Sequence, residues 1–325
     1  MKAVRVHEYG DESVLRYEDA PDPVAGEGEV LLRVRASALN RGDLGRRAGL
    51  FPGAGPLVEP LIIGWDVAGD VVSVGPAVTG FAPGQRVVAR IDGGGYAELV
   101  AAKAEGAVAI PEGVNYEQAA SLPVAYLTAW VALFETVKLQ PGETVLVQAV
   151  SAGVGMAGVQ IAKHAGKAGV VFTTAGTMER ANRGLELGAD YASTYDDFVE
   201  TVMRHTNGRG VDVALEMVGG KVFTDSQRAL AEGGRLVSVG RSSREDTVID
   251  TALAEEKHQE VTIGWNLGRE RRVPDQMKDL EKVLELVKGG TLEVVIDRTF
   301  PLSETAEAHR YLARRGQFGK VLLIP

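Results

Sequence analysis

TVLVQAVSAGVGMAGVQIAKHAG, residues 144–166, is the stretch of sequence that decides the fold. An apolar run over 144–150 is typical of a buried strand, and residues 159–165 continue as a helix. Between them Gly153-Val154-Gly155-Met156-Ala157-Gly158 matches G-x-G-x-x-G in the strand–turn–helix setting that this motif requires. The first glycine permits the turn, the second lets backbone approach a pyrophosphate, and the third lets the helix pack against the strand. Phosphates are also favoured at a helix N-terminus. We therefore expect Gly153, Val154, Gly155 and Gly158 to bind a dinucleotide; the alternative is a glycine-rich packing turn without a ligand.

Strand and helix patterns alternate on both sides of this motif. The expected strands are 144–150, 169–173, 211–217, 234–239 and 261–263, and the expected helices are 159–165, 179–187 and 221–231. Continuous apolar strands joined by helices predict a parallel sheet covered on both faces. The sequence before residue 115 instead shows short strands with turn residues between them, such as 30–34, 67–74 and 86–89, which predict an antiparallel sheet or barrel.

The remaining segments complete an α/β chain with two domains. Asn115 and Gln118 fit the start of a helix, which the apolar sequence continues to about Phe134. The tail shows helix patterns over 277–287 and 304–314 and a closing strand over 320–324. We expect a β-rich first domain (1–118), a doubly wound domain (119–264) and a tail (265–325) that returns to the first domain.

Composition excludes several kinds of function. The 325 residues include 44 acidic and 35 basic side chains, a formal net charge of −9, and no cysteine. Disulfides, thiol nucleophiles and zinc sites with sulfur ligands are therefore excluded. The acidic balance speaks against nucleic-acid binding. The N-terminus lacks the apolar core of a signal peptide, and polar or glycine residues interrupt both apolar runs (118–134 and 144–162), so we expect a cytoplasmic protein without a membrane span.

The second expected strand of the doubly wound domain indicates which dinucleotide binds. An NAD site normally has Asp or Glu at the end of that strand. Here residues 172–177 read FTTAGT, with no acid before Glu179, and Arg180 and Arg183 follow on one helix face. The hydroxyl of Thr174 and the guanidinium groups of Arg180 and Arg183 suit a 2′-phosphate, which predicts NADPH. The alternative is that both arginines are solvated surface residues.

Beyond this domain, the chain resembles the medium-chain dehydrogenase/reductase superfamily, and within it the zinc-free quinone oxidoreductases. The motifs that carry the resemblance are ALNRGDLGRRAGLFP (38–52), IIGWDVAGDVVSVG (62–75), GGGYAELV (93–100), SLPVAYLTAWVALFE (121–135), VSAGVGMAGVQIAKHAG (150–166), ELGADY (186–191), GVDVALEMVGG (210–220), GGRLVSVGR (233–241) and FGKVLLIP (318–325). The resemblance implies a GroES-like catalytic domain, a Rossmann domain and a cofactor in the cleft between them.

The same resemblance implies roles for individual residues. It places Asn40 and Asp43 at the floor of the active site and Thr128 against the nicotinamide ribose or amide. The residues that it places along the cofactor are Val239, Gly240, Trp265 and Asn266, with Arg315 near the 2′-phosphate. A turn-stabilising amide is the alternative for Asn40, and helix packing is the alternative for Thr128.

Departures from the family pattern bear on metal and on substrate. Zinc-dependent relatives have Cys where this chain has Asn40, and Gly-His-Glu where it has Gly64-Trp65-Asp66, and the five histidines have no metal-ligand spacing, so we expect no catalytic metal. Tyrosines of several quinone and enoyl reductases are replaced by Gly45 and Phe51, which removes a phenolic proton donor. Arg46 and Arg47 stay open: either could bind a substrate oxygen or be solvated.

These observations leave three functions to weigh. The first is NADPH-dependent reduction of quinones by hydride transfer, without zinc or flavin. The second is reduction of the C=C bond of an alkenal or enone with the same cofactor. The third, from another class, is an NADPH-binding protein with a structural or RNA-associated role, which the acidic charge disfavours. The strand over 261–263 is a candidate sheet edge for a homodimer.

Overall fold

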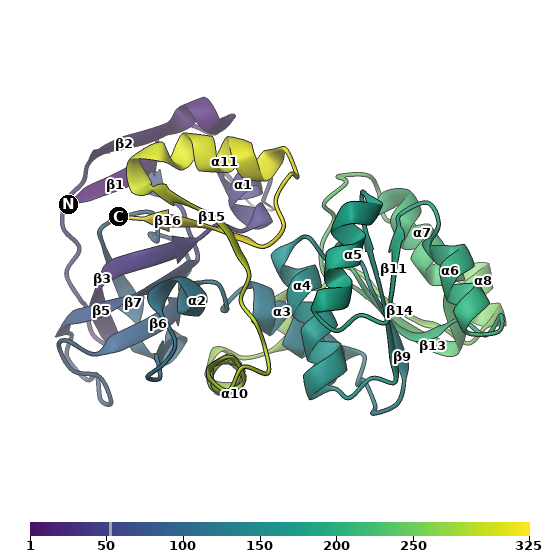
Figure 1. Cartoon of the computed structure of the whole chain (residues 1–325). Helices are drawn as coiled ribbons and strands as arrows, with labels where there is room; N and C mark the ends of the chain where they lie inside the picture. The colour runs from purple at the N-terminus through teal and green to yellow at the C-terminus, as the bar shows by residue number, and fades with distance from the viewer. Residues whose placement is uncertain (52–53) are drawn as a thin grey trace. The chain divides into compact units, whose positions relative to one another are not determined.

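The computed structural model describes residues 1–51 and 54–325, and the chain divides into two units (Figure 1). The first unit comprises Met1–Ala125, Val273–Gly290 and Val294–Pro325. The second unit comprises Tyr126–Arg272 and Thr291–Glu293. Pro52, which ends one of the family motifs, lies outside the described residues.

A parallel sheet organises the second unit, all of whose residues are described. Its six strands run in the order β11-β10-β9-β12-β13-β14. They are β9 (Thr144–Val147), β10 (Val170–Ala175), β11 (Tyr191–Thr194), β12 (Val211–Glu216), β13 (Leu230–Ser238) and β14 (Glu260–Thr262). The chain moves outward from β9 to β11, crosses back to β12 and moves outward again to β14, so the order reverses between β9 and β12. Such a switch point is where open α/β sheets bind ligands, outside the carboxyl ends of the strands.

Helices cover both faces of this sheet. Figure 1 shows α4 and α5 on one side of the strands and α6, α7 and α8 on the other. Their bounds are α4 (Gly153–Gln160), continued by a π-helical turn (Ile161–Ala165), α5 (Met178–Glu186), α6 (Phe198–His205), α7 (Gly220–Arg228), α8 (Thr251–Glu256) and α9 (Leu267–Glu270). Crossovers between parallel strands are right-handed, so connections that run in opposite directions along the sheet lie on opposite faces of it. The reversal at the switch point therefore places helices on both faces. The expected strands and helices of this region are present, and β11, α6, α8 and α9 are additional.

An antiparallel sheet organises the first unit. Among the described residues its strands run in the order β15-β16-β3-β5-β6-β8, with β7 also pairing with β3 and with β15 parallel to β16. They are β3 (Glu29–Ala38), β5 (Asp66–Val74), β6 (Arg86–Arg90), β7 (Leu99–Lys103), β8 (Ala107–Ala109), β15 (Ile296–Pro301) and β16 (Lys320–Ile324). A smaller sheet has the order β2-β1-β4, with β1 (Lys2–Val6), β2 (Leu15–Asp19) and β4 (Leu61–Ile62). The expected closing strand is confirmed as β16, which pairs with β3 and so returns the tail to this unit.

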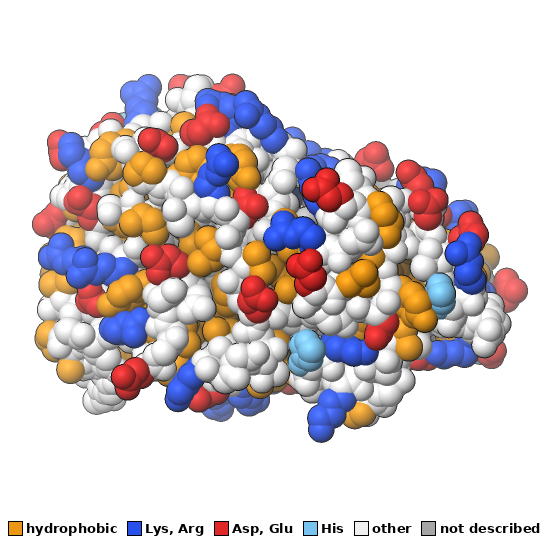
Figure 2. Space-filling view, viewed as in Figure 1, with side chains coloured by type: hydrophobic (Ala, Val, Ile, Leu, Met, Phe, Trp, Pro, Cys, Tyr) orange, Lys and Arg blue, Asp and Glu red, His pale blue; other side chains and the backbone are white. Residues whose placement is uncertain are grey.

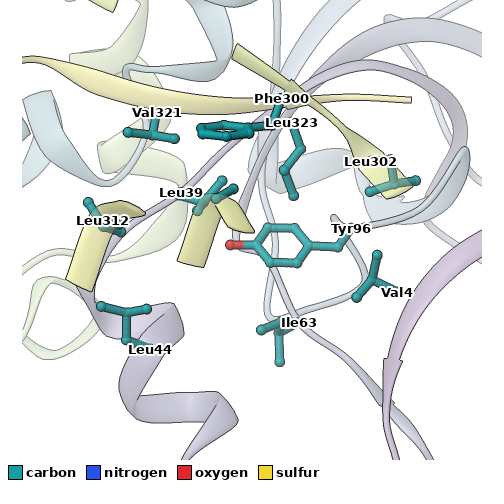
Figure 3. Close-up of a cluster of buried hydrophobic side chains, with 11 residues drawn as sticks. Val4, Leu39, Leu44, Ile63, Tyr96, Phe300, Leu302, Leu312, Val321 and Leu323 are labelled. Atoms are coloured by element: carbon teal, nitrogen blue, oxygen red, sulfur yellow. The ribbon is translucent and has the colours of Figure 1, made fainter. Parts of the chain in front are cut away.

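The first unit also contains helices. They are α1 (Arg41–Arg47), α2 (Tyr116–Ala120), α10 (Val273–Lys288) and α11 (Thr305–Ala313), with 3-10 turns at Glu12–Val14, Ala104–Gly106 and Leu302–Glu304. One core of this unit packs around Tyr96, whose ring lies among Leu39, Ile63 and Leu302 (Figure 3). The Tyr96 hydroxyl points toward Leu39 and Leu44, away from Val4.

The prediction of one long helix from Asn115 to Phe134 is wrong. The cap is confirmed, because the Asn115 side chain accepts from Gln118 N (2.7 Å) and the Gln118 side chain accepts from Asn115 N (3.0 Å). The helix nevertheless ends at Ala120, and a new helix, α3 (Ala125–Val131), begins beyond Pro123 and continues as a π-helical turn (Ala132–Thr136). Proline lacks an N–H group and clashes with the preceding turn, so Pro123 interrupts the helix within the apolar run.

Two further expectations concern the surface charge, which was predicted not to suit nucleic acid, and the predicted absence of a membrane-spanning helix. Figure 2 shows Lys and Arg side chains interspersed with Asp and Glu on the face in view. None of the helices formed by the described residues has the length and apolar character that a membrane span requires.

Candidate functional site

The glycine loop of the second unit leads from β9 into α4. A Cβ atom at Gly155 would lie 2.1 Å from the Ala149 carbonyl oxygen and 2.7 Å from that of Gln148. At Gly158 it would lie 2.7 Å from Leu215 Cδ2 and 3.0 Å from Val147 Cγ1. The chain therefore folds back on itself at Gly155, and α4 packs closely against the sheet at Gly158. This cradle, at the switch point and at a helix N-terminus, fits the pyrophosphate of a dinucleotide.

The other predicted cofactor residues of this unit lie at the same edge of the sheet. Thr174 is near the end of β10, Val239 and Gly240 follow β13, and Trp265 and Asn266 follow β14. Because these strands are parallel, their carboxyl ends meet at the edge that holds the glycine loop. The structure thus brings these predicted residues to one edge of one sheet.

Thr174 stabilises the start of the glycine loop from the interior of the unit. Its side chain is fully buried, and its hydroxyl donates to Gln148 Oε1 and accepts from Ala149 N (3.3 Å). Gln148 Nε2 in turn donates to Ser226 Oγ (2.9 Å). Thr174 therefore orders the loop from inside the unit and does not present its hydroxyl at the surface.

The remaining residues predicted to contact the cofactor lie on or beside helices. Arg180 and Arg183 lie on α5, whose N-terminus is capped by the hydroxyl of Thr177. Thr128 is buried on α3. Arg315 follows α11 in the first unit, with a φ of 56°. Asn266 caps α9 by accepting from Gly268 N (3.0 Å), and the Trp265 indole donates to Thr136 Oγ1 (2.9 Å).

Glu216 holds the loops after β12 and β13 together. Its carboxylate accepts from Val218 N (2.5 Å), Gly219 N (2.7 Å) and Ser238 Oγ (2.9 Å). Burial raises the pKa of this carboxyl, and the backbone N–H donors oppose that rise. This buried carboxylate, together with the hydrogen bond from Val239 N to the Glu216 carbonyl (2.8 Å), therefore ties the segment that carries Val239 and Gly240 to β12.

A buried polar cluster lies in the first unit, where β3, β5 and β16 meet. Lys320 Nζ donates to Asn40 Oδ1 (2.8 Å) and to the Leu39 carbonyl (3.0 Å). Asn40 Nδ2 donates to Asp66 Oδ2 (2.8 Å). Burial lowers the pKa of Lys320, while the negative charges of Asp66 and Asp43 oppose that change. Three charged or polar side chains thus form one chain of hydrogen bonds, Lys320–Asn40–Asp66.

Asp43 and Tyr96 extend this cluster on its other side. Asp43 Oδ2 accepts from Asn40 N (2.7 Å) and from the Tyr96 hydroxyl (3.0 Å). Burial raises the pKa of Asp43 to about 7. Burial, followed by the Asp43 charge, raises the pKa of Tyr96. All five members of the cluster are buried, but Asn40 keeps 8% of its surface accessible and Lys320 keeps 3%, whereas Asp43, Asp66 and Tyr96 keep none. Asn40 is therefore the member best placed to meet a ligand.

The structure answers the question that the sequence left open for Arg47. Its side chain is buried, with Nε donating to the Gly10 carbonyl (3.2 Å) and Nη1 lying 3.2 Å from His309 Nδ1. Arg47 therefore links α1 to α11 inside the first unit and is not a solvated residue. Arg46, its neighbour, is partly exposed.

Sequence reasoning passed over four residues that organise these two sites. They are Asp66, Tyr96, Glu216 and Lys320, and each lies inside a motif that carries the family resemblance. Their polar character within otherwise apolar or glycine-rich motifs was the available signal. The partners of Asp66, Tyr96 and Lys320 were not visible, because those contacts join segments far apart in the chain.

Known proteins similar to this chain confirm the predicted family. One family model, described as alcohol dehydrogenase GroES-like domain, matches residues 26–112, and another, described as zinc-binding dehydrogenase, matches residues 187–323. The quinone oxidoreductase of Pseudomonas aeruginosa is 32% identical over 330 residues, which are 100% of this chain and 99% of that protein. The quinone oxidoreductase of Rattus norvegicus is 32% identical over 331 residues, which are 100% of this chain and 98% of that protein.

Solved structures give the same result. The mycobacterial protein Rv1454c complexed with NADPH has a TM-score of 0.92 and 31% identity, and Escherichia coli quinone oxidoreductase complexed with NADPH has a TM-score of 0.91 and 28% identity. Both comparisons cover 100% of each chain. The protein is a medium-chain dehydrogenase/reductase with a GroES-like and a Rossmann domain, as predicted. Within that superfamily the chain belongs to the quinone oxidoreductase branch and is an oxidoreductase.

Much longer proteins also contain a region similar to this chain. The polyketide synthase GfsB of Streptomyces halstedii is 36% identical over 299 residues, but the chain spans only 5% of its length. A phenolphthiocerol/phthiocerol polyketide synthase of Mycobacterium tuberculosis is 32% identical over 298 residues, and the chain spans 13% of its length.

The zinc named by one family description does not fit the residues present here. Asn40 Oδ1 already accepts from the Lys320 ammonium, and an ammonium beside a donor atom opposes a divalent cation. Trp65, at another ligand position of the zinc-dependent relatives, offers no ligand atom. Residues 1–51 and 54–325 contain no group of three or more His, Asp or Glu side chains placed to hold a metal ion.

Proposed function

We propose that this chain reduces quinones by hydride transfer from NADPH. The main support for this cofactor is the glycine cradle at the switch point, followed by the strand β10, which ends without an acidic residue. Arg180 and Arg183 on α5 supply the positive charge that a 2′-phosphate needs. The NADPH complexes of two similar proteins support the same cofactor.

Bound NADPH supplies a hydride, and the chain's own residues bind and orient both reactants. The glycine loop, the segment after β13 and the segment after β14 would hold the cofactor on the second unit. In the first unit, Asn40 presents a buried amide whose N–H groups can donate to the acceptor's oxygen. Such a donor stabilises negative charge that develops on oxygen during reduction.

An aromatic corner beside Asn40 supports a quinone rather than an aliphatic enone. Trp65 directly precedes Asp66 in β5, and its ring lies 5.5 Å from that of Phe51 at an interplanar angle of 72°. Two glycines of α1 make room for these rings: a Cβ would lie 2.3 Å from Trp65 at Gly42 and 3.3 Å from Phe51 at Gly45. Partly exposed aromatic rings next to the polar cluster favour a planar, electron-poor ring as the acceptor.

The direct test measures oxidation of NADPH from the loss of its absorbance. Three reactions are compared: one with 1,4-benzoquinone, one with an α,β-enone and one without acceptor. NADH in parallel tests the cofactor preference. Turnover with NADPH on the quinone, and much less on the enone, is the expected result. The reverse preference would replace the proposal with enone reduction, and NADPH binding without turnover on either acceptor would favour a structural or RNA-associated role.

Assembly and location belong to this proposal as well. The edge position of β14 in its sheet supports a homodimer formed by strand pairing. Light scattering at micromolar concentration tests it, and a mass near the 34.5 kDa of one chain would contradict it. A cytoplasmic location and the absence of nucleic-acid partners stay predictions.

A further inference from the structure

We propose that Lys320 is a positioning residue that fixes the Asn40 amide, so that one Asn40 N–H faces the acceptor's oxygen. This inference rests on the proposed function and names a residue for it that the sequence did not single out. Strand pairing sets the arrangement: Leu322 pairs with Ala38 and Leu39 N donates to the Val321 carbonyl, so the antiparallel register continues to Lys320 opposite Asn40. The pairing of β3 with β16 therefore brings together Asn40, just beyond the end of β3, and Lys320, at the start of β16.

The chemistry of the two neighbours allows the amide one orientation. The Lys320 ammonium can only donate, and an ionised Asp66 carboxylate can only accept. Asn40 Oδ1 lies 2.8 Å from Lys320 Nζ, and Asn40 Nδ2 lies 2.8 Å from Asp66 Oδ2. Turning the amide over would set its NH₂ against the ammonium and its oxygen against the carboxylate. The pair consequently locks the amide in this orientation.

One N–H of the locked amide is left with a weak contact. Nδ2 carries two hydrogens, of which one is directed to Asp66 and the other makes a 3.4 Å contact with the Ala38 carbonyl. That contact is long for a hydrogen bond, so this second N–H is the one that can turn to an acceptor. Because Asn40 is the most exposed member of the cluster, this N–H is also the one that a ligand can reach.

The Lys320 charge strengthens this donor. A cation bonded to the amide oxygen draws electron density from the nitrogen, and hydrogen bonds in a chain polarise one another where the dielectric constant is low. Asp43 and Asp66 face the cluster from α1 and β5, and the positive charge of Arg90 on β6 also acts on Asp66. Lys320 is buried among them, so water does not screen it effectively.

The test compares Lys320→Met, which keeps the stem and removes the cation, with Lys320→Arg and with the exposed control Lys288→Met. We expect Lys320→Met to lower kcat for quinone reduction by about 10- to 100-fold, less than the roughly 10²- to 10³-fold loss on removing such a donor outright, with unchanged affinity for NADPH. Lys320→Arg keeps the charge and should restore part of the rate. Loss of the cation also raises the carboxyl pKa values of the cluster, so the acid limb of the kcat profile should move to higher pH. An unchanged profile, with activity that only follows the folded fraction, would overturn the proposal.

A double variant separates positioning from simple charge balance. Lys320→Met combined with Asp66→Asn removes one positive and one negative group, so we expect it to regain thermal stability while kcat stays low. Recovery of both stability and kcat would show that Lys320 only neutralises a buried charge, and would overturn the proposal.

A readout independent of turnover keeps this inference distinct from the proposed function. In the folded protein the Asn40 side-chain N–H protons, observed by NMR with labelled asparagine, should exchange slowly, and Lys320→Met should speed their exchange. If wild-type protein binds NADPH but reduces no quinone, the proposed function fails while this measurement still decides the positioning. If the Asn40 signals are the same in both proteins, the positioning fails whatever the turnover.

Discussion

At the residue scale, two glycines of the cofactor loop differ in what a methyl group would meet. At Gly155 the nearest atom is the Ala149 carbonyl oxygen, 2.1 Å away, and backbone cannot rotate aside. At Gly158 the nearest atom is Leu215 Cδ2, 2.7 Å away, which can move, and alanine also gains about 1 kcal/mol of helix propensity. We expect Gly155→Ala to lose about 3 kcal/mol of unfolding free energy and most NADPH affinity, and Gly158→Ala to lose about 1 kcal/mol. Urea unfolding and fluorescence titration with NADPH measure both; equal losses would contradict the geometry.

The arginines of α5 carry a second prediction at this scale. If Arg180 and Arg183 bind the 2′-phosphate, losing either charge-assisted contact removes about 1.5–3 kcal/mol, or roughly ten- to a hundredfold in affinity for NADPH. NADH lacks that phosphate, so its affinity should hardly change. Titration of Arg180→Ala and Arg183→Ala with both cofactors makes the measurement, and Arg204→Ala on the exposed surface of α6 is the control. NADPH affinity untouched in both variants would return the cofactor choice to NADH.

Single residues also show where sequence reasoning ends. Gly153 to Gly158 could be assigned from their spacing, because a turn, a helix start and close packing are local properties. The partnership of Asn40 with Lys320 could not, because it joins positions 280 residues apart through a strand pairing that no local pattern reveals. Asp66 presented the same difficulty, since its carboxylate serves Asn40, 26 residues away.

At the element scale, Glu216 connects β12 to the segment after β13, and this predicts the effect of removing its charge. Glu216→Gln replaces an acceptor oxygen by an NH₂ group, which then faces N–H or O–H donors. We expect a loss of about 1–3 kcal/mol in unfolding free energy and weaker NADPH binding, since the segment at Val239 and Gly240 loses its side-chain hydrogen bond to β12 and keeps only its backbone bonds. Glu232→Gln, at an exposed position of β13, is the matched control. Identical NADPH affinity in the two variants would remove Glu216 from the cofactor site.

The elements that the sequence predicted well are those with strong, local patterns. β16 and α5 lie within one residue of their expected bounds, because an apolar run and an amphipathic period define each of them. The apolar run through Pro123 was misjudged, since hydrophobicity favoured one buried helix and the missing N–H of proline broke it. β11 and β15 were missed because both are only partly buried and lack a continuous apolar run.

At the scale of the whole molecule, the returning tail closes the first unit through a buried histidine. His309 on α11 lies beside Arg47 of α1 and against the ring of Tyr96, with centroids 5.7 Å apart. Arg47 donates to Nδ1, so the proton of the neutral ring is on Nε2, which has no hydrogen-bond partner among the described residues. Burial, with the Arg47 charge, lowers the pKa of His309 to about 3. Protonation of His309 therefore opposes the docking of the tail.

His309 and Asp43 should give the folded chain opposite responses to pH. The unfolded chain binds a proton at His309 below its ordinary pKa of 6.5 and the folded chain does not until about pH 3, so stability from this group is lost as pH falls across that window. The pKa of Asp43 is raised from 3.8 to about 7, so the folded chain keeps its proton there and stability from this group is lost as pH rises from about 4 to 7.

Between about pH 4 and 6.5 each group changes the unfolding free energy by about 1.4 kcal/mol per pH unit, with opposite signs that cancel in the wild type. His309→Gln should therefore gain stability relative to the wild type as pH falls through this window, and Asp43→Asn should lose it. Urea unfolding at half-unit pH steps measures both, and differences from the wild type remove the contributions of all other groups. Parallel curves for the three proteins would mean that neither group titrates differently in the folded and unfolded chains, and that the tail docks without regard to the His309 proton.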